Sequence, residues 1–336
     1  MDAVSRWGID LILILQRFSP GLDGLMKTLS FLGEENFFLI LIPFLYWCVD
    51  TAWGMRALAV LVLSDFTNGL FKGAFHAPRP HWIDPRVKAL SVETSYGIPS
   101  GHAQNAAAVW GLLARAINTG WAWVGAVILV LAISLSRIYL GVHFPHDVVA
   151  GWIIGAVVLA VWQWAEPRVG RWLKPKPLVA QIGAALALSF LMLGVALAAR
   201  AALAGVADPP SWETQAASAA PPPAGRPATD PRNMDGLLVT LGVVFGVGAG
   251  FALMRRYTPF DAGGPWVKRL VRLTLGLAVL VALRVTLGAI FPVEPPTVGM
   301  LFRYLRYALM GLWMIWLAPW VFIRIGLAEA ASRLQG

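Results

Sequence analysis

Long apolar stretches are the feature that most limits what this chain can fold into. The hydrocarbon core of a bilayer is about 30 Å thick, and an α-helix needs about 20 mainly apolar residues to cross it. Residues 179–203 form one such stretch. Of the 336 residues, 58% are hydrophobic and only 13% are charged, whereas about 25% are charged in a soluble domain. The sequence therefore predicts an all-α integral membrane protein, folded as a polytopic helix bundle.

We expect about nine transmembrane helices, counted from the apolar runs and the polar, glycine- or proline-bearing breaks between them. They lie near residues 31–49, 56–71, 103–117, 121–140, 147–165, 179–203, 236–254, 270–291 and 300–323. Residues 7–19 are also apolar but too short to span, which suits an interfacial or re-entrant helix.

These runs predict five regions along the chain. The N-terminal interfacial or re-entrant helix occupies 1–30, and a membrane core occupies 31–166. A basic hinge and the sixth span follow at 167–206. The proline- and alanine-rich stretch 207–235 is expected to be a flexible linker. Residues 236–336 form a three-helix membrane region to which the sequence assigns no role.

Composition also narrows the classes of partner. The net charge is +9. Basic residues that flank apolar spans usually orient a membrane protein or meet anionic lipid head groups. We therefore expect membrane lipids, and no nucleic acid, as partners. The chain has one cysteine, Cys48, so an intramolecular disulfide is excluded. We interpret Cys48 as a small buried apolar residue. Nothing in the sequence indicates an oligomeric state.

Three polar stretches break the apolar pattern between residues 72 and 147. They read KGAFHAPRP at 72–80, PSGH at 99–102 and SRIYLGVHFPHD at 136–147. Together they contain four of the five histidines of the chain, namely His76, His102, His143 and His146, and the fifth, His81, directly follows the first stretch. Because successive spans alternate in direction, the helix ends that carry these stretches fall on one face of the membrane. The sequence therefore predicts a single site.

The basic residues of these stretches suit a phosphate group, which carries two or more negative charges. Lys72, Arg79 and Arg137 can neutralise that charge. Ser100 and Gly101 open a predicted helix, where backbone amides point towards an anion. The Ser100 hydroxyl can either cap this helix or donate to a phosphate oxygen.

Two histidines can divide the remaining chemistry. One attacks phosphorus, and the other protonates the leaving oxygen. Asp147 follows His143 by four residues, a spacing that lets its carboxylate hold the far ring nitrogen of that histidine and fix its tautomer. The three stretches thus contain the groups needed for phosphoryl transfer.

The three stretches have the forms K-x6-RP, PSGH and SR-x5-H-x3-D. In order, spacing and residue identity they resemble the type-2 phosphatidic acid phosphatase and haloperoxidase superfamily, in its membrane-embedded lipid phosphatase branch. The likeness covers residues 30–165, so it implies that 31–166 is a phosphatase core. It implies that His143 is the nucleophile, that Asp147 orients it and that His102 is the general acid. It also implies phosphate binding by Lys72, Arg79, Ser100, Gly101 and Arg137, with no metal and no cofactor.

The resemblance leads us to expect a metal-independent lipid phosphatase that forms a phosphohistidine and hydrolyses a phosphomonoester or diphosphate. The sequence does not choose among undecaprenyl diphosphate, phosphatidylglycerol phosphate, phosphatidic acid and sphingoid-base phosphates. One alternative is transfer of the phosphoryl group to another lipid or to a sugar. Another is movement of a lipid or anion through the C-terminal helices.

The distribution of positive charge predicts which way the site faces. Basic residues gather at 168–176 and 255–269, which lie on one face if nine spans are counted. The face richer in Lys and Arg is expected to be cytoplasmic. The site lies opposite, so we expect it on the periplasmic or extracellular side of a bacterial inner (plasma) membrane.

Other polar residues allow two interpretations each. His76, His81 and His146 are interpreted as structural or adjacent to substrate. Asp65 and Asn68 lie on the helix that ends at Lys72, and we favour hydrogen bonds between helices for both. Glu34 and Glu35 either organise basic side chains near the site or face solvent. Arg284, Arg303 and Arg306 either bind a lipid head group or phosphate, or anchor their helices at the interface.

Overall fold

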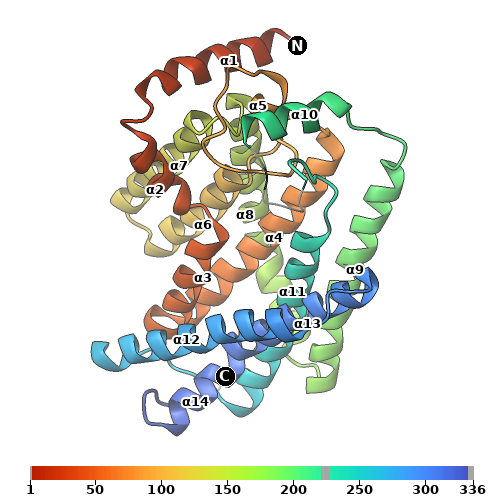
Figure 1. The fold of residues 1–336 in the computed structure, drawn as a ribbon. Coiled ribbons are helices and arrows are strands. Elements are labelled where there is room, and N and C mark those ends of the chain that lie inside the picture. Colours follow the sequence, from red (N-terminus) through yellow and green to blue (C-terminus); the bar gives the residue numbers. More distant parts are fainter. Residues whose placement is uncertain (1, 221, 223–226, 332–336) are drawn as a thin grey trace. The chain divides into compact units, whose positions relative to one another are not determined.

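The computed structural model describes residues 2–220, 222 and 227–331, which form α-helices and no β-sheet (Figure 1). The helices are α1 (Ala3–Leu15), α2 (Asp23–Phe31), α3 (Glu35–Phe44), α4 (Thr51–Phe75), α5 (Pro80–Ile83), α6 (Gly101–Ile117), α7 (Gly120–Tyr139), α8 (Pro145–Leu173), α9 (Leu178–Ala202), α10 (Pro210–Ala219), α11 (Asp235–Tyr257), α12 (Trp266–Ile290), α13 (Pro296–Leu312) and α14 (Ala318–Arg324). The expected all-α polytopic membrane fold is confirmed.

The expected count of nine spans is not confirmed. Seven helical stretches of the described chain are long and apolar enough to cross a membrane, and there are eight if the bent pair Asp23–Phe31 and Glu35–Val49 is one span. The expected span at 103–117 lies in α6, which has 17 residues. At a rise of about 1.5 Å per residue, α6 measures roughly 26 Å, less than the bilayer core of about 30 Å.

The chain divides into two compact units, each built from three separate segments. The first unit comprises Met1–Phe38, Leu63–Val161 and Leu197–Asn233. The second unit comprises Leu39–Val62, Trp162–Ala196 and Met234–Gly336. Within these bounds, all three polar stretches identified in the sequence belong to the first unit.

In the first unit, α6 and α8 approach each other closely because α8 carries glycine at the contact. A Cβ atom at Gly151 would lie 2.7 Å from the carbonyl oxygen of Ser100, and one at Gly155 would lie 2.5 Å from that of Gln104. Real side chains do not tolerate such distances, so larger residues would force the helices apart. Glycine at these two positions therefore fixes the start of α6 against the start of α8.

Hydrogen bonds between α4 and α6 join the two helices further. Asn68 donates to the Gln104 side chain over 2.9 Å, and Asn105 donates to the Asp65 carboxylate over 2.7 Å. Polar groups within a membrane are expensive unless they are paired. The interpretation of Asp65 and Asn68 as residues that form hydrogen bonds between helices is confirmed.

The second unit is held by small residues. A Cβ atom at Gly242 would overlap the Tyr304 carbonyl oxygen, and one at Gly246 would overlap that of Ala308. Helices α11 and α13 therefore pack backbone against backbone, as small residues permit in membranes. Cys48 is buried, as interpreted.

The arginines of the second unit have protein contacts. Arg303 pairs with Asp235 over 2.9 Å, and the Arg306 guanidinium lies 5.1 Å from the ring centre of Tyr307. These contacts suit the interpretation that both residues anchor helix ends.

The stretch expected to be a flexible linker contains α10, which packs against α5 (Figure 1). Pro210 occupies the first turn of α10, where the missing amide hydrogen of proline does no harm. The structure thus differs from the expectation, because proline and alanine content alone does not reveal a helix that is stabilised by distant contacts.

Candidate active site

The site forms where four helix ends of the first unit meet. The end of α4 carries Lys72, the start of α6 carries Ser100, the end of α7 carries Arg137 and the start of α8 carries Asp147. The backbone amide of Ser100 donates to the carbonyl oxygen of Asp147 over 2.9 Å, so the starts of α6 and α8 are joined directly. The residues that the sequence placed in one site thus lie on elements that converge.

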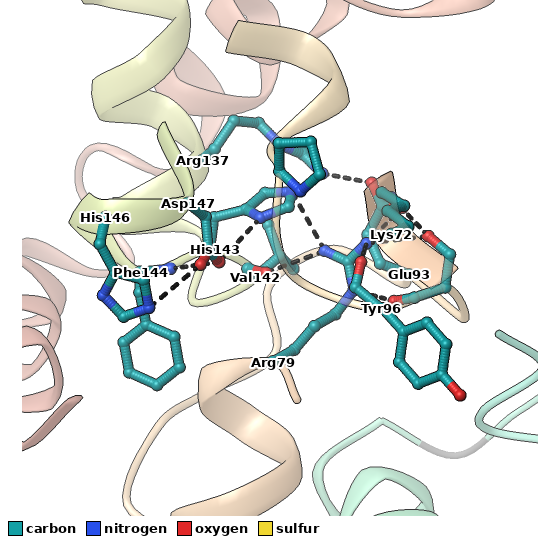
Figure 2. Close-up of polar contacts among 12 residues, drawn as sticks. Lys72, Arg79, Glu93, Tyr96, Arg137, Val142, His143, Phe144, His146 and Asp147 are labelled. Carbon is teal, nitrogen blue, oxygen red and sulfur yellow. Dashed lines mark hydrogen bonds and ion pairs between the residues drawn. The ribbon is translucent and has the colours of Figure 1, made fainter. Parts of the chain in front are cut away.

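His143 lies between a carboxylate and a guanidinium, as Figure 2 shows. Its Nδ1 is 3.1 Å from Asp147 Oδ2, and its Nε2 is 3.2 Å from Arg79 Nη1. The same Asp147 oxygen accepts the backbone amide hydrogen of Phe144 over 2.9 Å. Since a carboxylate only accepts and an arginine only donates, these partners assign the proton to Nδ1, and the Nε2 lone pair accepts from Arg79.

Arg79 is fully buried and held by backbone carbonyl groups. It donates to the carbonyl oxygens of Ser95 over 2.6 Å, Val142 over 2.8 Å and Tyr96 over 3.2 Å. A planar guanidinium held at several donors cannot rotate freely. Arg79 is therefore oriented towards His143 before any substrate binds.

Lys72 and Arg137 complete a cluster of three cations. Lys72 Nζ donates to Ser95 Oγ over 2.7 Å, and Arg137 Nη1 donates to Ser30 Oγ over 2.6 Å. The side chain of Arg137 is buried. Three positive charges in a water-poor site attract an anion far more strongly than the same charges would in bulk water.

Glu93 supplies the negative charge that balances this cluster. Its carboxylate pairs with Arg137 and lies 3.6 Å from Arg79 Nη2. Burial alone would raise the pKa of Glu93, but the positive charges of Arg137 and Arg79 outweigh that effect and hold its pKa below the usual range. Glu93 is therefore a carboxylate at neutral pH.

Sequence reasoning missed Glu93, Ser95 and Ser30. A signal was present for Glu93, which is one of two acids, with Asp84, between the RP step at 79–80 and PSGH at 99–102. A buried cation cluster needs a counter-charge, so a carboxylate in that loop is a reasonable candidate. The two serines carry no comparable signal in the sequence.

Burial and positive charge lower the pKa of His143, which lies in the connection between α7 and α8. Desolvation has the largest effect, followed by the charges of Arg79, Arg137 and Lys72, and together they place the pKa well below the usual histidine range. His143 is therefore neutral near pH 7, which is the form that can act as a nucleophile.

The start of α6 presents polar atoms whose hydrogen bonds are not filled by the described residues. Ser100 makes no capping bond, and its buried Oγ has no partner there; the same holds for Nε2 of His102. Gly101 lies close to Asn68, because a Cβ atom would be 3.3 Å from Asn68 Oδ1. Of the two roles considered for Ser100, this geometry favours donation to a bound group over helix capping.

The other three histidines lie around the site. His81 Nδ1 is 3.0 Å from the Gly141 carbonyl oxygen. The His146 ring stacks on Phe144 with centroids 5.0 Å apart, and its Nε2 is 3.3 Å from Asp147 Oδ1. His76 contacts Asp208, with Nε2 3.0 Å from Oδ1. Each of these contacts is made to the protein itself, which suits a structural role.

A cavity of about 260 Å³ adjoins the cation cluster and shares Ser30 with it. Its walls combine charged, hydroxyl and apolar groups, from Lys27, Ser30, Glu34, Leu90, Ser91 and Leu140. Glu34, expected either near the site or in solvent, thus lines a cavity beside the site. Within the described ranges, no three His, Cys, Asp or Glu side chains gather so that they could hold a metal ion.

The fold and the site define a helical membrane protein with buried cations around a carboxylate-oriented histidine. Comparison with family models agrees with this class. Residues 53–170 match the PAP2 superfamily, and residues 238–330 match the transmembrane extension of PAP2 superfamily phosphatases. The chain belongs to the PAP2 superfamily, and the first match contains every expected site residue.

Individual curated proteins match only part of this chain, at moderate sequence identity. The chain is 31% identical over 194 residues to glucose-6-phosphatase catalytic subunit 1 of Haplochromis nubilus, and the alignment covers 48% of this chain and 54% of the relative. It is 26% identical over 204 residues to lipid phosphate phosphatase delta of Arabidopsis thaliana, and this alignment covers 55% of this chain and 48% of the relative. The chain thus matches about half the length of these curated relatives.

A solved structure is also similar, namely a transmembrane PAP2-type phosphatidylglycerolphosphate phosphatase from Bacillus subtilis. The sequence identity is 24% and the TM-score is 0.43, over 50% of this chain and 89% of that one.

Proposed function

We propose that this protein is a membrane-embedded phosphatase that hydrolyses a lipid phosphomonoester or diphosphate through a phosphohistidine. The observation that carries the proposal is the position of His143, with Nδ1 3.1 Å from Asp147 and Nε2 3.2 Å from Arg79. A nucleophilic nitrogen next to a phosphate-binding guanidinium is the arrangement that in-line attack on phosphorus requires.

In the first step, the bound phosphate takes over the hydrogen bond that Arg79 makes to Nε2 of His143, and the freed Nε2 lone pair attacks phosphorus. An N–P bond forms and the P–O bond to the leaving group breaks, while His102 gives its proton to the leaving oxygen. His102 takes up this proton from solvent as substrate binds, because the negative charge of the phosphate favours its protonated form. Asp147 stabilises the positive charge that develops on the ring of His143.

In the second step, the N–P bond is hydrolysed. His102, now neutral, takes a proton from water as the water oxygen bonds to phosphorus. The N–P bond breaks, its electron pair returns to Nε2 of His143, and inorganic phosphate leaves. His102 and His143 are then in their starting states, so the cycle closes without a net proton change on the enzyme.

The three cations stabilise the negative charge on the phosphoryl oxygens throughout. Arg137, whose Nε has no partner among the described residues, can donate two hydrogen bonds to a phosphate, and Lys72 adds a point charge. Arg79 can donate to the phosphate the N–H that points at Nε2 of His143 before substrate binds. We propose that Ser100 and the amide of Gly101 donate to the same group. Because these residues already supply compensating positive charge, we propose that the reaction needs no metal and no other cofactor.

The preferred substrate class is a lipid phosphate, as in the relative named lipid phosphate phosphatase delta. Phosphatidic acid, phosphatidylglycerol phosphate, undecaprenyl diphosphate and sphingoid-base phosphates all carry the required group. We propose that the site faces outward, because basic residues at 168–176 and 255–269 mark the opposite, cytoplasmic face.

A second candidate substrate is a water-soluble sugar phosphate. Two observations favour it: the 31% identity to a glucose-6-phosphatase catalytic subunit and the polar walls of the adjoining cavity, where Lys27, Ser30, Glu34 and Ser91 offer partners for hydroxyl groups. Transfer of the phosphoryl group to an acceptor other than water would use the same first step.

The deciding experiment measures phosphate release from the four lipid phosphates and from glucose 6-phosphate, with the full-length protein in detergent and EDTA present. Activity on a lipid, with none on the sugar phosphate, is the expected result. Radiolabelled phosphate that appears on a second lipid or sugar would indicate transfer instead. If His143→Ala and His102→Ala both release phosphate at the parent rate, the proposed mechanism is wrong.

A further inference from the structure

Residues 208–220 and 227–232, which we call the strap, lie between the two stretches that match family models, 53–170 and 238–330. Neither model therefore describes them. The strap belongs to the first unit, as does the site, and its helix α10 packs beside α5 (Figure 1). Since α5 begins directly after Arg79, the strap lies on the loop that carries a phosphate-binding residue.

Aromatic contacts hold the strap on this loop. The ring of Trp212 lies 6.0 Å from Trp82 and 5.8 Å from His76, measured between ring centres. Ala216 and Ala228 of the strap share a buried cluster with Trp82 and Tyr96. Packing of this kind orders a chain segment that is poor in other apolar residues.

Polar contacts fasten the strap at both of its ends. Asp208 Oδ1 accepts the Tyr96 hydroxyl over 2.9 Å and lies 3.0 Å from His76 Nε2. Near the other end, the Asp230 amide donates to the Thr94 carbonyl oxygen over 2.9 Å. Both contacts converge on the short segment 94–96.

The same segment also forms hydrogen bonds with Arg79 and Lys72, two cations of the site. Ser95 and Tyr96 offer their carbonyl oxygens to Arg79 over 2.6 and 3.2 Å, and Ser95 Oγ accepts from Lys72 over 2.7 Å. Figure 2 shows the Tyr96 hydroxyl pointing away from Arg79. The backbone of Tyr96 thus contacts Arg79 while its side chain reaches Asp208.

We propose that Asp208 is a positioning residue of the phosphate site, which acts through Tyr96 to fix the orientation of Arg79. This inference rests on the proposed function only in taking Arg79 as a phosphate ligand. Asp208 does not touch the phosphate. It sets how firmly segment 94–96 holds the guanidinium, and hence how tightly the site binds a phosphate group.

The test compares Asp208→Asn and Tyr96→Phe in full-length protein in detergent. Tyr96→Phe removes the hydroxyl that donates the hydrogen bond to Asp208. Asp208→Asn keeps an oxygen that can accept it, but removes the negative charge that strengthens it and that faces His76 and Arg232. Both substitutions leave the backbone and the packing volume nearly unchanged. We expect KM to rise about 5- to 20-fold in Tyr96→Phe, and by less in Asp208→Asn, with kcat within about twofold, because a loosened ligand weakens phosphate binding in the ground and transition states alike. The double variant should be no worse than Tyr96→Phe, since both substitutions act on one interaction.

Asp230→Asn is the matched control. It changes a carboxylate on the same strap whose side chain bonds to Asn233 and whose link to Thr94 is made by the backbone. Its KM should equal that of the parent. Parent-like KM in Asp208→Asn and Tyr96→Phe would overturn the proposal, and so would a loss of kcat at unchanged KM.

A binding measurement separates this inference from the proposed function. Inorganic phosphate should raise the melting temperature of the parent and of Asp230→Asn, because a ligand that binds only the folded state stabilises it. The rise should be smaller in Asp208→Asn. If the parent hydrolyses no substrate but this difference is present, the proposed function fails while the positioning role stands. Equal rises in all three proteins would refute the role itself.

Discussion

Both units of this protein bury an arginine that donates to three backbone carbonyl groups, Arg79 in the first unit and Arg272 in the second. They differ in the surroundings of that arginine, because Arg79 lies beside His143 in a cluster of buried charges. In the second unit, α11 and α13 pack through Gly242 and Gly246 with backbone atoms in contact. Removal of a charge near the site in the first unit should therefore lower activity. Added side-chain volume between α11 and α13 in the second unit should lower stability.

The largest effect is expected for His143→Ala. Loss of the proposed nucleophile should lower kcat by a factor of about 10³ or more, while the melting temperature changes by only a few degrees. Phosphate release and thermal unfolding, measured on the same preparation, check both parts. A variant with parent-like turnover would show that Nε2 of His143 does not form the proposed bond.

Arg79→Lys should lower kcat/KM by about 10²- to 10³-fold, because lysine cannot reproduce the planar fork that bridges His143 and the carbonyl groups. Arg86→Lys is the matched control. Arg86 belongs to the same loop, but its side chain is largely exposed and pairs with Asp84. Similar losses in both variants would show that the effect arises from the loop as a whole and not from the guanidinium at position 79.

Gly246→Ala tests the second unit. The added Cβ would overlap the carbonyl oxygen of Ala308, and overpacking of this kind typically lowers the free energy of unfolding by about 1–3 kcal/mol. Gly236→Ala, at the start of the same helix, meets no atom within 4 Å and should leave stability unchanged. Thermal unfolding in detergent compares the two, and equal melting temperatures would contradict backbone contact between α11 and α13.

The smallest expected effect is in the pH profile. A histidine with a pKa of about 6.5 is roughly three-quarters protonated at pH 6 and would lose about fourfold in activity. The pKa of His143 is lowered by burial and by the adjacent cations, so the neutral nucleophile persists and kcat/KM at pH 6 should fall by less than about twofold. An acid limb centred at pH 6.5 or above would contradict the shift.

The same shift has a consequence for stability. Below about pH 6.5 the unfolded chain binds a proton at position 143 that the folded chain does not bind, so the folded state loses stability as pH falls from that value. Chemical unfolding at pH 5 and pH 7 measures this change, and a higher stability at pH 5 would count against it.

Much of the site could be predicted from the sequence because its residues sit at helix ends. Once a span ends at Lys72 and another begins at Asp147, alternation brings them to one face without knowledge of the loops. Glu93 and Ser95 could not be placed in this way, since a loop conformation depends on contacts with distant parts of the chain.

The strap shows the same limit. Asp208 meets Tyr96, 112 positions away in the chain, and no local pattern encodes that contact. The exact number of spans stays a prediction, because α6, which covers the expected span at 103–117, has only 17 residues and donates from Gln104 and Asn105 to side chains of α4.

The bond from the Ser100 amide to the Asp147 carbonyl oxygen has a consequence for how this protein can be altered. It joins the helix that carries His102, the proposed proton donor, to the helix whose first turn carries Asp147, and it involves main-chain atoms only. Apart from proline at position 100, no substitution removes either atom. Substitutions in the cavity walls are therefore expected to leave the separation of His102 and His143 unchanged.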